Sequence, residues 1–153
     1  IADKSLNIYW FLGFIKYYFP NSTFIHCERD PKDNCLSIFK NLFEDGQGWK
    51  YNESELIEYY KLYSDIMKFW NSKYKDGILN VRYEELVNNS EKEIKKIINY
   101  CNLDWDDNCL NHHKNNQPIK TLSLNQANKP IYSTSVKSSD NFKHYLKEIF
   151  SAF

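Results

Sequence analysis

Residues 23–37 read T-F-I-H-C-E-R-D-P-K-D-N-C-L-S, and this stretch decides the fold. Its first part, Thr23–Cys27, is a short run of apolar and β-branched residues, too short for a core helix and typical of a buried strand. The polar turn Glu28-Arg29-Asp30 follows it. Pro31 then suits the first position of a helix, because its missing N–H would have no partner there in any case. The stretch therefore predicts a strand, a polar turn and a helix.

The pattern continues outward from this unit. Helical periodicity and strand-like runs alternate along the rest of the chain, and Ser90 to Glu93 resembles a capping box ahead of one helix. The predicted helices cover Leu6–Phe19, Pro31–Phe43, Ser54–Lys75, Ile94–Tyr100, Asp106–His113 and a terminal segment from Asp140, and the second strand covers Ile78–Tyr83. Such alternation predicts an α/β fold with parallel strands. Ligands of these sheets bind beyond the C-terminal strand ends, where Arg29 and Tyr83 both fall.

Composition narrows the class of protein. The chain has 153 residues, which suits one domain, and its 20 Lys and Arg balance its 20 Asp and Glu. The chain therefore has no net positive charge to attract nucleic acid or an anionic membrane, and an anion site would depend on local residues. No apolar run approaches the roughly 20 residues of a membrane span. The four cysteines form no C-x-x-C pair, which disfavours a zinc site or a disulfide scaffold and favours a reducing compartment.

Arg29 and Ser37 form the candidate anion site. Arg29 offers a planar fork of N–H donors, Ser37 offers a hydroxyl eight residues later, and the start of the helix adds a positive dipole end. This combination suits a phosphate group. The alternative is that Arg29 pairs with Asp30 or Asp33 and that Ser37 is a neutral helix residue.

At this point the chain resembles the sulfotransferases that use 3'-phosphoadenosine-5'-phosphosulfate, in particular the bacterial forms joined to tetratricopeptide repeats and the protein-tyrosine sulfotransferases. The R-D-P-x-D-x-x-x-S pattern from Arg29 to Ser37 is the most specific part of the resemblance. The matching blocks occur in the family's order, and they are Ala2-Asp3-Lys4, Phe19-Pro20-Asn21, Ile25–Ser37, Val81–Val87, Thr121–Gln126 and Lys129–Tyr132.

The resemblance implies roles for individual residues. Arg29 and Ser37 would bind the 3'-phosphate of the sulfate donor, and Tyr83 would lie beside the adenine or its ribose. For Tyr83 the alternative is a strand-end side chain packed in the core. Lys4 would be catalytic, because an ammonium group there could neutralise the charge that grows as the bond to the departing phosphate breaks.

A late loop also matches the family. Ser123, as a second catalytic residue, and Gln126 and Lys129, as donor-binding residues, would fold over the donor phosphates and exclude water. The match is imperfect, since the family continues Q-V-R-x-P and later G-R-W. This chain has Gln126-Ala127-Asn128-Lys129-Pro130 and Lys137-Ser138-Ser139 instead, so Lys129 or Lys137 would have to supply the missing cation.

The family's first phosphate loop has no counterpart in this sequence. That loop is rich in Gly, Ser and Thr, follows a strand, and cradles the 5'-phosphosulfate with backbone N–H groups. We therefore expect residues 1–153 to be the C-terminal part of a single sulfotransferase domain, with an incomplete P-loop-NTPase-like parallel sheet flanked by helices. The general base is expected in the missing N-terminal half. His26, His112 and His113 are disfavoured for that role, the first as a strand residue and the others as surface residues.

Sulfuryl transfer from the donor to an acceptor hydroxyl or amine is thus the leading hypothesis. It needs positioning and charge stabilisation, and no metal is expected. The acceptor could be a carbohydrate, a protein tyrosine or a small alcohol, and the compartment would be the cytoplasm, with the secretory pathway as the alternative. A second hypothesis is a non-catalytic nucleotide-binding or interaction module with the same ancestry. A P-loop kinase relative is disfavoured because no GxxxxGK[ST] motif occurs.

Overall fold

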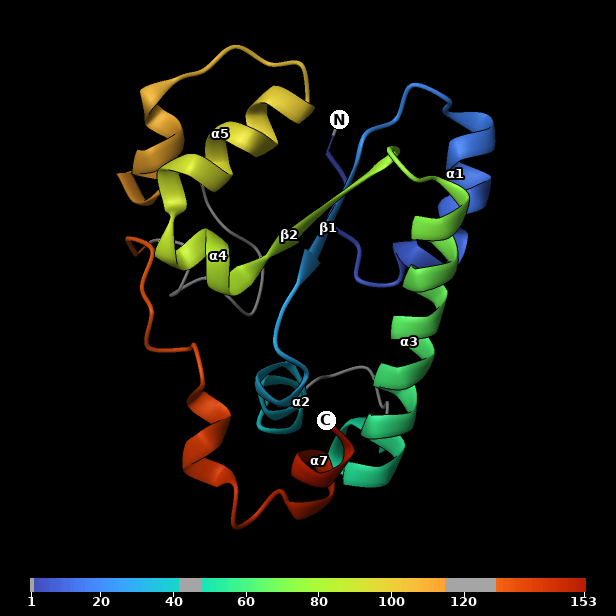
Figure 1. The fold of residues 1–153 in the computed structure, drawn as a ribbon, viewed down its shortest axis with the longest axis vertical. Coiled ribbons are helices and arrows are strands. Elements are labelled where there is room, and N and C mark those ends of the chain that lie inside the picture. Colours follow the sequence, from blue (N-terminus) through green and yellow to red (C-terminus); the bar gives the residue numbers. More distant parts are fainter. Residues whose placement is uncertain (1, 42–47, 115–128) are drawn as a thin grey trace. The chain divides into compact units, whose positions relative to one another are not determined.

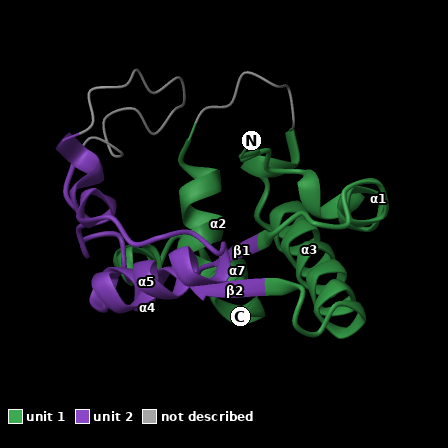
Figure 2. Ribbon diagram, turned by 90° about the horizontal axis from the view of Figure 1, so that it is seen from above, with its two compact units in different colours: residues 1–24, 30–78, 137–153 green, residues 25–29, 79–136 purple. Residues whose placement is uncertain are grey.

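A computed structural model describes residues 2–41, 48–114 and 129–153. The chain divides into two compact units, shown in different colours in Figure 2. Unit 1 contains residues 1–24, 30–78 and 137–153, and unit 2 contains residues 25–29 and 79–136. The elements, with η for a 3-10 helix, are η1 (Ile8–Phe11), α1 (Leu12–Tyr18), β1 (Phe24–Glu28), α2 (Pro31–Phe39), η2 (Gly48–Tyr51), α3 (Glu53–Lys73), β2 (Ile78–Arg82), α4 (Tyr83–Asn88), α5 (Ser90–Tyr100), η3 (Asp107–Lys114), η4 (Ser138–Phe142) and α7 (Lys147–Ala152).

The two strands form one parallel sheet. β1 and β2 are hydrogen-bonded neighbours, and Figure 1 shows their arrows pointing the same way. The connection between them runs through α2 and α3, as a parallel pair requires, because a short hairpin turn cannot return the chain to the same edge. The mixed α/β class with parallel strands and flanking helices is therefore confirmed.

Unit 1 is built around one apolar cluster. The buried residues of this cluster come from α2, α3, α7 and the residue before α7, and they are Cys35, Leu36, Leu56, Ile57, Leu146 and Ile149. The Cys35 side chain is fully buried, and burial, with the Asp30 carboxylate as a second cause, raises the pKa of its thiol to about 12. Cys35 therefore stays protonated at neutral pH and acts as a small apolar core residue.

The N-terminal helices of unit 1 pack on α3 through aromatic side chains. The indole Nε1 of Trp70 donates a hydrogen bond of 2.8 Å to the carbonyl oxygen of Tyr9. The Tyr9 hydroxyl in turn donates to the Tyr59 hydroxyl at 3.0 Å. Burial and that neighbouring hydroxyl both raise the pKa of Tyr9, so the Tyr9 hydroxyl stays neutral. Gly13, near the start of α1, lies directly against the Trp70 ring, where a β-carbon would meet the ring carbon Cη2 at 2.7 Å.

We expect Gly13→Ala to destabilise unit 1. The added methyl group overlaps the Trp70 ring, and the ring cannot turn away without losing its bond to Tyr9. Overpacking of this kind lowers the free energy of unfolding by about 1 to 3 kcal/mol. The better helix propensity of alanine raises it by roughly 1 kcal/mol, so we expect a net decrease of about 1 kcal/mol. Urea unfolding followed by tryptophan fluorescence measures it. Gly48→Ala is the matched control, because a β-carbon at Gly48 meets no atom within 4 Å, and equal effects of the two substitutions would refute the steric argument.

Unit 2 contains most of the sheet and two helices that follow it. α4 begins at Tyr83, directly after β2, and α5 packs against both α4 and η3. Val81 of β2 is 1% exposed and supplies the buried face of the strand. His26 of β1 contacts Asn80 of β2, with 2.8 Å between His26 Nδ1 and Asn80 Oδ1. This contact gives His26 a cross-strand structural role.

Three local predictions need correction. The second strand ends at Arg82 and not at Tyr83, because Tyr83 begins α4, a helix that the sequence pattern did not predict. The capping box at Ser90 is wrong: Ser90 is already inside α5, and its hydroxyl donates backward to the Val87 carbonyl at 3.3 Å. The terminal helix does not start at Asp140, which lies in η4, since the α-helical turns begin only at Lys147. Among the described helices, none combines the length and the apolar character that crossing a membrane would need.

Candidate functional site

The candidate site begins where the two strands end. Arg29 follows β1 and Tyr83 follows β2, so the parallel pairing brings both residues to the same edge of the sheet. The guanidinium carbon of Arg29 lies 5.0 Å from the centre of the Tyr83 ring. This distance is within the range of a cation–π contact, which holds the arginine against the aromatic face. The structure therefore brings these two predicted residues together.

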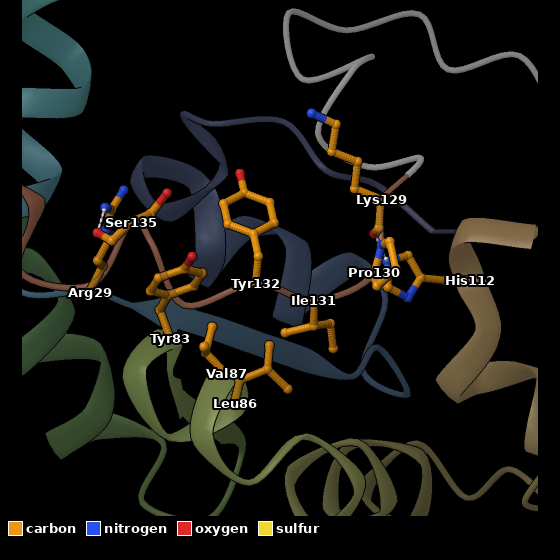
Figure 3. Close-up of a pocket in the computed structure, with 10 residues that line it drawn as sticks. All are labelled: Arg29, Tyr83, Leu86, Val87, His112, Lys129, Pro130, Ile131, Tyr132 and Ser135. Atoms are coloured by element: carbon orange, nitrogen blue, oxygen red, sulfur yellow. Dashed lines mark hydrogen bonds between the residues drawn. The ribbon is translucent and has the colours of Figure 1, made fainter.

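One wall of the site is a face of α4. Tyr83, Leu86 and Val87 have the spacing i, i+3, i+4, so they lie on one side of this helix. The opposite wall is the segment 129–136, which leads out of the site toward η4. The α4 wall thus places apolar and aromatic side chains beside the Arg29 guanidinium, as Figure 3 shows.

The walls enclose a pocket of about 320 Å³. It is lined by Arg29, Tyr83, Leu86, Val87, His112, Lys129, Pro130, Ile131, Tyr132 and Ser135. This volume lies at the lower end of the range that is usual for small-molecule sites, roughly 300 to 1,000 Å³. Arg29 lies at one end of the pocket and Lys129 at the other (Figure 3), and the described lining contains no acidic side chain. The electrostatics favour a ligand with negative charge.

Arg29 is oriented by the segment opposite α4. Its Nη2 donates a hydrogen bond of 2.6 Å to the backbone carbonyl oxygen of Ser135. Together with the Tyr83 ring, this bond fixes the plane of the guanidinium group, whose other N–H groups form the rest of its donor fork. A planar donor group that is already oriented loses little entropy when it binds an anion.

His112 is exposed, as the sequence analysis expected, and it also lines the pocket. Its Nε2 lies 3.1 Å from the carbonyl oxygen of Lys129. A carbonyl can only accept, so Nε2 must carry the proton and donate. His112 therefore holds the start of the segment 129–136, and no sequence signal could have indicated this, because the bond joins residues 17 positions apart.

The remaining predicted site residues are not among the described residues that line the pocket. Ser37 is half-buried in α2 and belongs to unit 1, whereas Arg29 belongs to unit 2, so their joint action stays a prediction. Lys4 is exposed in an irregular segment of unit 1. Ser123 and Gln126 lie outside the described residues. Within the described ranges, no group of three or more His, Cys, Asp or Glu side chains could hold a metal ion.

A comparison with models of protein families shows which family this chain belongs to. A model described as the sulfotransferase family matches residues 1–107. The chain belongs to the sulfotransferase family. The matched range includes Arg29, Ser37 and Tyr83, and it ends before the segment 129–136 that forms the second wall of the pocket.

A relative of this sulfotransferase-family chain occurs in Aquifex aeolicus (strain VF5). It is an uncharacterized protein, 28% identical over 152 residues. The aligned region covers 97% of this chain but only 20% of the Aquifex protein, so the chain spans about a fifth of the length of that relative. The similarity to the Aquifex protein therefore covers nearly the whole chain, and it gives no information on activity.

Proposed function

We propose that this chain is the C-terminal part of one sulfotransferase domain, and that its pocket binds the nucleotide of 3'-phosphoadenosine-5'-phosphosulfate. The observation that carries the proposal is the Arg29 guanidinium, held over the Tyr83 ring at the C-terminal edge of a parallel sheet. In this arrangement Arg29, with Ser37, binds the 3'-phosphate, and Tyr83 contacts the adenine or its ribose.

The chemistry of the pocket fits this ligand. The adenine is a flat apolar surface, which suits the aromatic and aliphatic lining, and the donor carries separate 3'- and 5'-phosphates. Cations at the two ends of the pocket, Arg29 and Lys129, suit a ligand with more than one anionic group. An acidic side chain would oppose such binding, and none is present in the described lining.

In the proposed reaction an acceptor hydroxyl, or an amine, attacks the sulfur of the donor in line. The new bond joins the acceptor atom to sulfur, the bond from sulfur to the 5'-phosphate oxygen breaks, and the acceptor proton passes to a base. Adenosine 3',5'-bisphosphate leaves as the second product. Lys4 would stabilise the charge that develops on the departing oxygen, and Ser123, Gln126 and Lys129 would close over the phosphates. The acceptor is a carbohydrate, a protein tyrosine or a small alcohol.

Calorimetry with two nucleotides tests the nucleotide assignment. We expect adenosine 3',5'-bisphosphate to bind at least roughly tenfold more tightly than adenosine 5'-phosphate, because hydrogen bonds to a charged group contribute about 1.5 to 3 kcal/mol. Equal affinities would overturn the assignment of a 3'-phosphate site. Incubation with the sulfate donor and the acceptor classes then separates the two functions, since a module that only binds nucleotide would bind the bisphosphate and transfer no sulfuryl group.

A further inference from the structure

The most deeply buried acidic group in the described structure has no role in the reaction proposed above. Asp33, in α2, is 1% exposed. One carboxylate oxygen, Oδ2, accepts the backbone N–H of Lys137 at 2.7 Å, and the other, Oδ1, accepts the backbone N–H of Ser139 at 2.8 Å. The Ser138 hydroxyl donates to Oδ1 over a longer 3.4 Å. All of these residues belong to unit 1, and the bonds join positions 104 to 106 residues apart.

These bonds hold an unusual backbone conformation. Lys137 has φ 57° and ψ 23°, in the left-handed region, which a residue with a side chain adopts only at a cost in free energy. η4 starts immediately after it, and Lys137, as the N-cap residue, makes no side-chain capping bond. The carboxylate of Asp33 caps the helix instead, and it stabilises the left-handed turn by accepting N–H groups on both sides of Ser138.

The neighbouring acid of the same motif caps its own helix. Asp30 is the N-cap of α2, and its Oδ1 accepts the backbone N–H of Lys32 at 2.9 Å and of Asp33 at 3.2 Å. The two acids of the R-D-P-x-D pattern thus have different structural roles. Asp30 begins the helix, and Asp33 reaches from the first turn of that helix to the far end of the chain.

The turn that Asp33 holds is the anchor of a pocket wall. The segment 129–136 is followed directly by Lys137. It contributes Lys129, Pro130, Ile131, Tyr132 and Ser135 to the lining. Ser135 lies only two residues before the anchored turn, and its carbonyl oxygen accepts from Arg29. If the backbone at Lys137 is free to rotate, the wall segment 129–136 loses a fixed C-terminal end.

We propose that Asp33 is a positioning residue, which fixes the C-terminal end of the wall segment 129–136 by binding the left-handed turn at Lys137. Its contribution to donor binding rests on the proposed function. Asp33 itself does not contact the ligand, and it acts through the backbone of Lys137 and Ser139. A carboxylate serves better than an amide here, because both of its oxygens accept, whereas asparagine would direct an NH₂ group at one of the two N–H donors.

Two substitutions three residues apart in the chain test this proposal, Asp33→Asn and, as its matched control, Asp30→Asn. Asparagine is as good an N-cap as aspartate, so Asp30→Asn should behave as the wild type. In hydrogen–deuterium exchange on the full chain, we expect Asp33→Asn to speed the exchange of peptides within residues 129–139 at least roughly tenfold, because a charge-assisted hydrogen bond is lost. Peptides from α3 should keep the wild-type rate.

Calorimetry with adenosine 3',5'-bisphosphate is the second measurement. The Kd should rise roughly tenfold in Asp33→Asn and stay unchanged in Asp30→Asn. Equal exchange of residues 129–139 in the two variants would overturn the proposal, and so would faster exchange with an unchanged Kd. If the wild type does not bind the bisphosphate, the proposed function fails, and the exchange measurement alone decides the role of Asp33.

A second variant covers the case in which Asp33→Asn does not fold. Glycine adopts the left-handed conformation without the steric cost of a β-carbon, so Lys137→Gly combined with Asp33→Asn should restore folding. Without the carboxylate, we expect exchange within residues 129–139 to stay faster, and the Kd to stay higher, than in Lys137→Gly alone. The same two measurements then apply. Exchange and Kd equal to those of Lys137→Gly alone would show that the carboxylate does not hold the wall, and would overturn the proposal.

Discussion

Replacing Arg29 by alanine is expected to remove the preference for adenosine 3',5'-bisphosphate over adenosine 5'-phosphate. The guanidinium is the charged group at the Arg29 end of the pocket, and it is held by the Tyr83 ring and by the Ser135 carbonyl. Its removal takes away charge-assisted hydrogen bonds of about 1.5 to 3 kcal/mol, which corresponds to roughly a 10- to 100-fold weaker Kd for the bisphosphate. The Kd for the 5'-phosphate should change much less. Calorimetry with both nucleotides gives the two values.

Arg82→Ala is the matched control for Arg29→Ala. Arg82 is the last residue of β2, is exposed, and does not line the pocket, yet its replacement changes the net charge of the chain by the same amount. If both variants weaken bisphosphate binding equally, the effect comes from the general charge and the assignment of Arg29 is wrong. Arg29→Lys adds a second comparison. It keeps the charge but loses the planar fork, so we expect an intermediate affinity.

The position of the site could be predicted from the sequence because the signals for it are local. A run of β-branched and apolar residues before Arg29, and a similar run before Tyr83, predict two strands. Helices between the strands favour a parallel arrangement, and parallel strands end at one edge. Arg29 and Tyr83 therefore had to lie near each other, and the structure places the guanidinium 5.0 Å from the ring centre.

The walls of the pocket could not be predicted in the same way. Tyr83 continues the strand pattern of Ile78 to Arg82, so the sequence alone did not distinguish a sixth strand residue from the first residue of a helix. The spacing of Tyr83, Leu86 and Val87 is a helical signal, but three residues are too few to outweigh the strand pattern before them. The second wall has no periodicity, and it depends on contacts with Arg29 and His112 far along the chain.

The start of the terminal helix shows the same limit. Ser138 to Phe142 form a 3-10 helix whose first turn is capped by Asp33, 104 to 106 residues earlier. A tertiary bond of this kind overrides local propensity, and no pattern in the sequence marks its partner. The failed capping box has a related cause, since the Ser90 hydroxyl bonds to the carbonyl of the preceding helix, an acceptor that the motif does not consider.

Replacing Leu56 by alanine is expected to give the largest loss of stability in unit 1. Leu56 lies in α3, is 1% exposed, and belongs to the buried cluster that joins α2, α3 and α7. The truncation removes buried apolar surface and leaves a cavity among side chains that come from three helices, which limits how far they can collapse into it. Such substitutions cost about 3 to 5 kcal/mol, a large part of the stability of a domain of this size. Urea unfolding followed by tryptophan fluorescence measures the loss.

Leu62→Ala makes the same change in the same helix at a position that is 47% exposed. Its effect should be within about 0.5 kcal/mol of zero, because little surface is buried there and alanine favours the helix. Equal losses in the two variants would mean that the cluster around Leu56 is not the core of unit 1.

Leu56→Ala also serves as a control for Arg29→Ala. Leu56 does not line the pocket, so Leu56→Ala, measured under conditions in which it stays folded, should bind the bisphosphate as the wild type does, while Arg29→Ala should not.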